Sequence, residues 1–251
     1  MSRDATPADV IAGAARWCVV EGDALALLAS LPDGAVDHVI TDPPYDEKTH
    51  REASARGVRP VRINFAPIEP RTVAANLVRV ARRWAVAFCA VEQVGAYAEA
   101  VGADAWIRAG AWDRPDACPQ FSGDRPAQAI EGIAIMHRAG RKAWCGGGKR
   151  GLWRHGVERG DGRAHPTQKP LPLMRELVRD FTDPGEVILD PFAGSGTTGV
   201  AALAEGRRVI LCERVPEYAE IARRRCEAAE RGTDWRAPAS QLGLFDAGGA
   251  R

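Results

Sequence analysis

Short apolar runs alternate with amphipathic segments along most of this chain. Seven of the runs have the length and composition of buried strands, and turn residues or segments of helical periodicity bound them. The predicted strands lie at 17–23, 36–42, 85–91, 105–113, 131–138, 186–190 and 207–213. The predicted helices lie at 24–32, 70–84, 171–181, 197–206 and 215–231. This alternation predicts an α/β fold whose doubly wound, mostly parallel sheet of about seven strands is covered by helices on both faces.

The remaining segments divide the chain. The runs at 105–113 and 131–138 flank an irregular Pro/Gly stretch, so we expect them to pair antiparallel. One domain at 16–229 is expected, with a flexible leader at 1–15 and a flexible tail at 230–251. Two segments within the domain lack periodicity: a basic loop at 46–67 and a Gly- and Arg-rich insertion at 139–164.

Composition narrows the class of protein. The formal net charge is only +1, so a nucleic-acid surface would be a local patch. Six cysteines are scattered with no C-x-x-C spacing, which predicts neither a disulfide framework nor a metal site. Cys18, Cys89 and Cys212 lie in apolar runs and are expected in the core. No signal-like or membrane-spanning segment is present, so we expect a cytoplasmic protein.

A glycine-rich turn follows the predicted strand at 186–190. Gly194, Gly196 and Gly199 have the G-x-G-x-x-G spacing, which first suggests dinucleotide binding. A dinucleotide fold needs two mononucleotide halves, and only one more strand and helix follow this turn. The order therefore indicates a circularly permuted sheet, in which the turn comes late in the chain.

The side chains around that turn suggest a different ligand. Asp190 ends the strand, where a carboxylate suits an amino group and not a pyrophosphate. Ser195, Thr197 and Thr198 offer hydroxyls to a carboxylate at the helix N-terminus. Glu213 ends the next strand, at the position of a ribose ligand. An amine, a carboxylate and a ribose diol together describe S-adenosyl-L-methionine.

Three motifs together resemble the permuted beta class of amino DNA methyltransferases, which modify adenine N6 or cytosine N4. The motifs are Asp42-Pro43-Pro44-Tyr45, then His165-Pro166-Thr167-Gln168-Lys169-Pro170, then the stretch from Asp190 to Thr198, in the order of that class. The resemblance implies a Rossmann-like methyltransferase domain over roughly 17–227 and places target recognition in the insertion at 139–164. It also implies roles for the cofactor-binding residues, namely Asp23, Thr167, Lys169, Asp190, Phe192, Gly194, Ser195, Gly196, Thr197 and Glu213.

Within those implied roles, Asp190, Gly194 and Gly196 cradle the methionine part, with Phe192 against it. Thr167 and Lys169 close over the methionine carboxylate, and Thr197 lies near it. Asp23 would contact the adenine end, although capping the helix that follows is an alternative and compatible role.

The residues of the Asp-Pro-Pro-Tyr motif suit the activation of an exocyclic amine on a base. An exocyclic amine is a poor nucleophile because its lone pair is delocalised into the base. Asp42 and the carbonyl of Pro43 can accept its two N–H groups, and the paired prolines fix that carbonyl's direction. Tyr45 offers a ring on which an extruded base can stack, worth roughly 1–3 kcal/mol. We therefore take Asp42, Pro43, Pro44 and Tyr45 as the catalytic motif.

The expected activity is site-specific methylation of adenine N6 in double-stranded DNA. Asp at the first motif position favours adenine, and cytosine N4 is the alternative. Two competing hypotheses are an RNA base methyltransferase and a non-catalytic DNA-binding regulator.

Two basic segments are candidate DNA contacts. The first holds five cations against one acid, and the second interleaves cations with Trp144, Trp153 and three glycines. The candidate DNA-binding residues are Lys48, Arg51, Arg56, Arg59, Arg62, Lys149, Arg150 and Arg154. A solvated loop is the alternative for each segment.

The tail carries one small apolar island. The stretch from Gln241 to Phe245 reads Gln-Leu-Gly-Leu-Phe and resembles the pentapeptide by which bacterial replication proteins bind the DNA polymerase sliding clamp. Packing of these side chains back onto the domain is the alternative. Partners considered are thus double-stranded DNA, a sliding clamp and a second copy of the chain, in a bacterium or a phage-infected bacterium.

Overall fold

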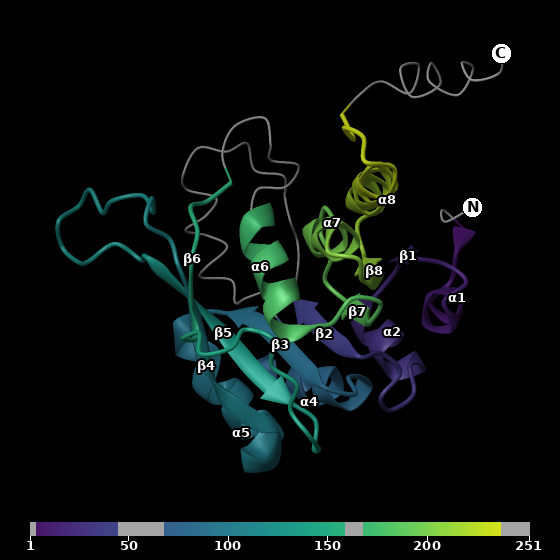
Figure 1. Ribbon diagram of the computed structural model, residues 1–251. Coiled ribbons are helices and arrows are strands. Elements are labelled where there is room, and N and C mark those ends of the chain that lie inside the picture. Colours follow the sequence, from purple (N-terminus) through teal and green to yellow (C-terminus); the bar gives the residue numbers. More distant parts are fainter. Residues whose placement is uncertain (1–3, 45–67, 159–167, 237–251) are drawn as a thin grey trace.

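The computed structural model describes residues 4–44, 68–158 and 168–236. Within them, eight strands form one sheet in the order β1-β8-β7-β2-β3-β5-β4-β6 (Figure 1). The strands are β1 (Trp17–Glu21), β2 (His38–Thr41), β3 (Trp84–Cys89), β4 (Trp106–Asp113), β5 (Ile130–His137), β6 (Leu152–Arg154), β7 (Val187–Asp190) and β8 (Arg208–Glu213). The α/β class predicted from the sequence is confirmed.

Strand directions follow the expected pattern. β1, β8, β7, β2 and β3 pair in parallel, and β5 runs antiparallel to both β3 and β4. The antiparallel pair predicted from 105–113 and 131–138 is therefore confirmed. The strand missing from the prediction is β6, which lies in the Gly/Arg-rich insertion and pairs in parallel with β4.

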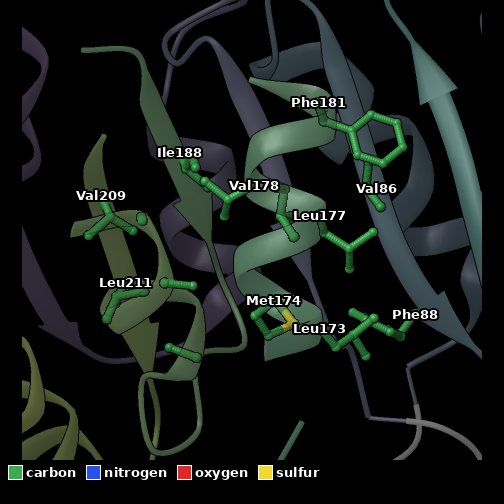
Figure 2. Close-up of a cluster of buried hydrophobic side chains, with 14 of the residues drawn as sticks. Val86, Phe88, Leu173, Met174, Leu177, Val178, Phe181, Ile188, Val209 and Leu211 are labelled. Carbon is green, nitrogen blue, oxygen red and sulfur yellow. The ribbon is translucent and has the colours of Figure 1, made fainter. Parts of the chain in front are cut away.

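Helices cover both faces of the sheet (Figure 1). One face carries α6 (Leu171–Phe181), α7 (Thr197–Ala204) and α8 (Pro216–Arg231), which share a buried cluster with the strands. Figure 2 shows part of that cluster, where Leu173 and Leu177 of α6 lie against Phe88 and Val86 of β3. The other face carries α1 (Pro7–Ala12), α2 (Ala24–Ser30), α4 (Pro70–Val80) and α5 (Val94–Ala105).

Two of these helices, α1 and α5, were not predicted. The sequence predicts a flexible leader at 1–15, but Thr6 and Asp9 form a reciprocal cap that starts α1, and Val10 is fully buried. This local cap outweighs the low apolar content of the segment. Cys18, Cys89 and Cys212 lie in the core as predicted. None of the helices within the described residues has the length and apolar character needed to cross a bilayer.

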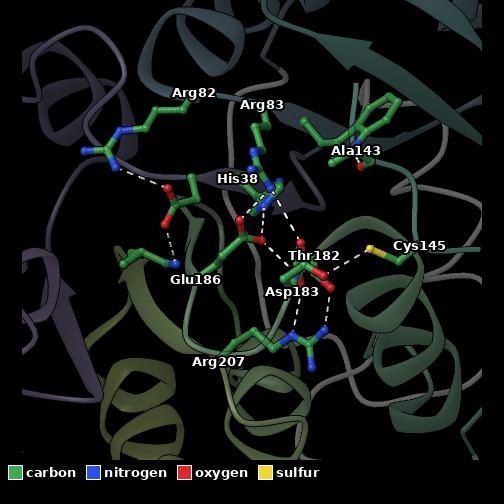
Figure 3. Close-up of polar contacts among 12 residues, drawn as sticks. His38, Arg82, Arg83, Ala143, Cys145, Thr182, Asp183, Glu186 and Arg207 are labelled. Carbon is green, nitrogen blue, oxygen red and sulfur yellow. Dashed lines mark hydrogen bonds and ion pairs between the residues drawn. The ribbon is translucent and has the colours of Figure 1, made fainter. Parts of the chain in front are cut away.

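A polar cluster joins the amino ends of the central strands (Figure 3). Glu186 accepts from His38 and Arg83 at 2.7 Å each, and Arg207 donates to Thr182. Burial would raise the pKa of Glu186, but these donors and the amide of Asp183 lower it overall. This cluster lies at the edge of the sheet opposite the motifs described next, so we assign it to the fold.

Candidate active site

The sequence motifs meet at the carboxyl edge of the sheet. Asp42 follows β2 and Asp190 ends β7, and these two strands are neighbours. From β7 the chain continues to its neighbour β8 on one side. From β2 it continues to its neighbour β3 on the opposite side. This is a topological switch point, where open α/β sheets bind their ligands.

Asp190 holds the two strand ends together. It is 2% exposed and accepts from the Thr41 hydroxyl at 2.6 Å, the Thr198 hydroxyl at 2.5 Å and the Phe192 amide at 3.1 Å. Burial raises the pKa of Asp190 to about 6, although these three donors oppose the shift. Asp190 therefore shapes the glycine turn, and the direct amine contact expected for it stays a prediction.

An open cradle lies beside Gly194. This residue has φ +51°, and a Cβ added to it would meet nothing within 4 Å; a Cβ added to Gly22 would also meet nothing within that distance. A Cβ on Gly196 would lie 2.8 Å from the Cβ of Ala222, so this glycine is required by packing of the loop on α8.

Glu213 supports the cradle from the end of β8. It accepts from the amides of Gly194 and Val215 at 2.8 Å each. Burial raises the pKa of Glu213 in spite of these bonds. Asp23 is exposed at the end of β1 and caps α2 through the Ala26 amide at 3.0 Å, so the capping role considered from the sequence is confirmed.

A buried arginine anchors the hydroxyl side of the loop. Arg225 of α8 donates to the Ser195 carbonyl at 2.7 Å, to the Ser195 hydroxyl at 2.9 Å and to the Thr197 hydroxyl at 3.2 Å. Burial lowers the pKa of Arg225 to about 10. Gln168 also lies against Ser195, at 3.2 Å, which brings the second motif to the third. Phe192 is half-buried and packs on the core of the face that carries α2 and α4.

Lys169 has different partners from those expected. Its Nζ lies 2.6 Å from Oδ2 of Asp42 and 2.7 Å from Oε1 of Glu131, on β5. The rings of Phe88 and Trp112 lie 4.8 Å and 5.9 Å from the same nitrogen. Burial alone would lower the pKa of Lys169, but Asp42 and Glu131 raise it overall, so the ammonium is charged. In this structure Lys169 bridges two acids, and its role over a methionine carboxylate stays a prediction.

The candidate DNA contacts of the insertion also differ in their surroundings. Lys149 pairs with Glu176 at 2.6 Å and Asp180 at 2.8 Å, both on α6, and buried Trp153 donates to the same Asp180. These two side chains hold the insertion on the fold. Arg150 and Arg154 are exposed, and Arg154 lies 3.5 Å from Asp113.

Several predicted site residues lie outside the described residues. Tyr45, Lys48, Arg51, Arg56, Arg59, Arg62 and Thr167 are in this group, as is the stretch from Gln241 to Phe245. Pro43 is buried and Pro44 half-buried, directly after Asp42.

Three residues of the site were not found from the sequence: Thr41, Glu131 and Arg225. Glu131 opens a predicted strand outside any motif, and only its pairing opposite Trp112 brings it toward Lys169. Arg225 is one of three consecutive arginines in α8. It differs from the other two only in the side of the helix on which it lies. The apolar residues flanking it at helical spacing were the available signal for its burial.

This geometry defines a Rossmann-like domain with an acidic motif and a glycine-turn cradle on adjacent strands. The DNA methylase family model (N6_N4_Mtase) matches residues 97–224, just over half of the chain. The chain belongs to this DNA methylase family.

Individual relatives match shorter stretches. The chain is 51% identical over 72 residues to the type II methyltransferase M2.DpnII of Streptococcus pneumoniae, which is 29% of this chain and 26% of that protein. It is 46% identical over 65 residues to the DNA adenine methyltransferase YhdJ of Escherichia coli K12, 26% of this chain and 22% of the relative. The chain thus spans under a third of the length of both relatives.

Solved structures match over most of the chain. TTHA0409 of Thermus thermophilus in complex with S-adenosyl-L-methionine is 25% identical, with a TM-score of 0.60 over 85% of this chain and 96% of that one. The cytosine-N4-specific PvuII DNA methyltransferase is 18% identical, with a TM-score of 0.67 over 91% and 90% of the two chains, and shows the fold alone.

Proposed function

We propose that this protein transfers a methyl group from S-adenosyl-L-methionine to the N6 amine of adenine in double-stranded DNA. One observation carries the proposal. The hydrogen bond from Thr41 to Asp190 joins the ends of β2 and β7, so the Asp42 motif and the Gly194 cradle share one edge of the sheet. A methyl acceptor at Asp42 and a donor at Gly194 would then be neighbours.

The residues present fit the cofactor. The space beside Gly194 and Gly22 is open to a ligand, and Glu213 and Asp23 place carboxylates at the ends of the two neighbouring strands. These acids suit the ribose hydroxyls and the adenine end, respectively. When bound, S-adenosyl-L-methionine supplies a sulfonium methyl group, which is transferred as the C–S bond breaks and sulfur keeps the electron pair.

The chain's own groups would prepare the acceptor. Asp42 and the Pro43 carbonyl accept the N–H groups of the target amine and turn its lone pair toward the methyl carbon. The lone pair forms the new N–C bond, and the nitrogen then releases a proton to solvent water. Catalysis comes from positioning and electrostatics, without a covalent enzyme intermediate. Base extrusion onto Tyr45 remains a prediction from the sequence.

The choice of adenine rests on two supports. Asp42 occupies the first motif position, and the relative YhdJ is named a DNA adenine methyltransferase. PvuII, named cytosine-N4-specific, shares the fold. Expression in a methylation-free host, followed by mass spectrometry of the DNA nucleosides, should yield N6-methyladenine. Detection of N4-methylcytosine instead would establish the cytosine alternative, and long-read sequencing would give the site.

A matched pair of variants tests the site itself. Asp42→Asn should bind cofactor and DNA with wild-type affinity but lose methyl transfer by a factor of about 100 or more, because a hydrogen-bond acceptor for the amine becomes a donor. Asp33→Asn, an exposed acid paired with Arg79, should retain transfer. Transfer to structured RNA instead of duplex DNA would support the RNA alternative, and no transfer to either would support the regulator.

Clamp docking and dimer formation are separate proposals. A peptide spanning Ala239 to Ala247 should bind a bacterial sliding clamp with a micromolar Kd, roughly −8 kcal/mol, and lose binding on the double change of Leu244 and Phe245 to Ala. Failure of the full-length chain to bind the clamp would remove this partner. Sedimentation of the free protein decides between monomer and dimer.

A further inference from the structure

We infer that Glu131 is a positioning residue that acts on Asp42 through Lys169. The inference rests on the proposed methyl transfer and adds to it a group from β5, which belongs to none of the three motifs. Glu131 and Asp42 both lie within 2.7 Å of one ammonium, so the three side chains form a single charge bridge.

The ion pair between Lys169 and Glu131 is largely buried, so its formation has an energetic cost. The side chains of Lys169 and Glu131 are 9% and 11% exposed, and each buried charge carries a desolvation penalty of several kcal/mol. One carboxylate would neutralise the ammonium. The second acid, Glu131, adds its own desolvation penalty, which Arg114 at 4.0 Å offsets in part.

Sharing the ammonium gives the second acid a function. A Lys169 bonded to Asp42 alone would neutralise that carboxylate and compete with the target amine for its oxygens. Glu131 draws part of the ammonium's hydrogen bonding away, so Asp42 keeps more of its strength as an acceptor. The Asp42 carboxylate also favours the positive charge that develops on the amine nitrogen during transfer.

The neighbouring side chains fix the position of the ammonium. Phe88 and Trp112 place ring faces near Lys169, and cation–π attraction adds to the two ion pairs. Trp112 lies opposite Glu131 in the pairing of β4 with β5, and Arg114 lies 4.0 Å from the second oxygen of Glu131. Glu131 is therefore held on β5, and Lys169 just before α6. Asp42 follows β2, which lies between β5 and the strand β7 that leads into the glycine turn.

Glu131→Gln tests the inference. It should lower kcat by about tenfold or more, equivalent to about 1.4 kcal/mol, with KM for DNA and calorimetric affinity for S-adenosyl-L-methionine within about twofold of wild type. Glu205→Gln is the matched control, because Glu205 is 12% exposed, contacts both Arg175 and Arg179, and lies at the far end of α7. It should leave kcat unchanged.

A double-mutant cycle tests the route through Lys169. If Glu131 acts only through the ammonium, Glu131→Gln combined with Lys169→Met should be no slower than Lys169→Met alone. In protein labelled with ¹⁵N at lysine, the ammonium signal lost in Lys169→Met should shift in Glu131→Gln and not in Glu205→Gln. This NMR readout is independent of turnover.

The outcomes separate the two proposals. Wild-type transfer with unchanged kcat in Glu131→Gln, or multiplicative losses in the cycle, overturns the role of Glu131 and leaves the proposed function intact. No transfer to DNA by the wild-type protein overturns the proposed function, and with it this inference.

Discussion

The hydroxyl of Thr41 donates a 2.6 Å hydrogen bond to the buried carboxylate of Asp190, 149 positions later in the chain. Thr41 is the last residue of β2 and precedes Asp42, whereas Asp190 is the last residue of β7 and precedes the glycine turn. One bond therefore fixes the separation between the methyl acceptor site and the cofactor site that we propose.

Thr41→Val should loosen that connection. The isosteric change leaves one oxygen of Asp190 with only the Phe192 amide among the donors described above, so the free energy of unfolding at pH 7 should fall by about 1–3 kcal/mol. Thr41→Ser keeps the hydroxyl and should retain most of the stability. Denaturant unfolding of the three proteins provides the comparison, and equal stability of Thr41→Val and wild type would contradict the connection.

Asp190 should give stability a specific dependence on pH. Burial raises its pKa from the ordinary value of 3.8 to about 6 in the folded protein, so the folded state binds the proton more tightly than the unfolded state does. The stability of wild type relative to Asp190→Asn should therefore decline as pH rises from about 4 to about 6, and stay constant above that. Urea unfolding of both proteins at a series of pH values measures this difference; a relative stability that rises over that range would reverse the assignment.

The glycines of the turn should separate ligand binding from folding. Gly194→Ala places a methyl group in the open cradle and adds backbone strain at φ +51°, so cofactor affinity should fall by about tenfold or more in a folded protein. Gly199→Ala directs its methyl group to within 2.7 Å of Leu211 and Cys226, so it should reduce thermal stability. Calorimetry and thermal melts of both variants check the contrast; unchanged affinity in Gly194→Ala would move the cofactor elsewhere.

The sequence predicted the parts of the site that depend on local order. Asp42, Gly194 and Glu213 each end or follow a strand, and parallel strands bring such residues to one edge of the sheet. Partners such as Glu131 and Arg225 come from segments outside the three motifs, and the sequence does not say which motif residue they contact. Glu131 meets Lys169 only because β5 runs antiparallel between β3 and β4.

The insertion shows the limit of reading charge from composition. Its mixture of cations and aromatics suggested a nucleic-acid surface, which stays a prediction; the structure adds that Trp153 is 1% exposed and that Lys149 pairs with two acids of α6. Asp180 decides both roles because it lies on the buried face of α6, where it accepts from both side chains. A buried acid in an amphipathic helix cannot be matched to its partners without the fold.

Lys149 and its exposed neighbours should consequently behave differently. Lys149→Gln leaves Asp180 and Glu176 without their shared cation, so the free energy of unfolding should fall by about 1–3 kcal/mol, with the salt dependence of DNA binding unchanged. Arg150→Gln combined with Arg154→Gln should preserve stability and reduce the slope of log affinity against log salt by about 2. Fluorescence anisotropy at several salt concentrations measures the slope. The opposite pattern would support the DNA-binding role that the sequence predicts for Lys149.

Arg225 should control cofactor affinity from behind the loop. It is 5% exposed and donates to both Ser195 and Thr197, and the ring of Trp235 lies 5.8 Å from its guanidinium. Arg225→Met keeps the length of the side chain but removes all three donated bonds, so the loop at the start of α7 should lose its fixed shape. We expect affinity for S-adenosyl-L-methionine to fall by about tenfold or more, because the loop must then be ordered during binding.

The adjacent arginine provides the control. Arg224 is exposed and donates to the Trp235 carbonyl at 3.3 Å, so Arg224→Met removes a cation from the same helix without touching the loop. Its cofactor affinity should match wild type, and Arg225→Lys should fall between the two, since an ammonium can replace some of the bonds but lacks the planar fork. Thermal melting should first confirm that each variant is folded, and calorimetry then measures its affinity for S-adenosyl-L-methionine. Equal affinities in Arg225→Met and Arg224→Met would show that the loop keeps its shape without Arg225.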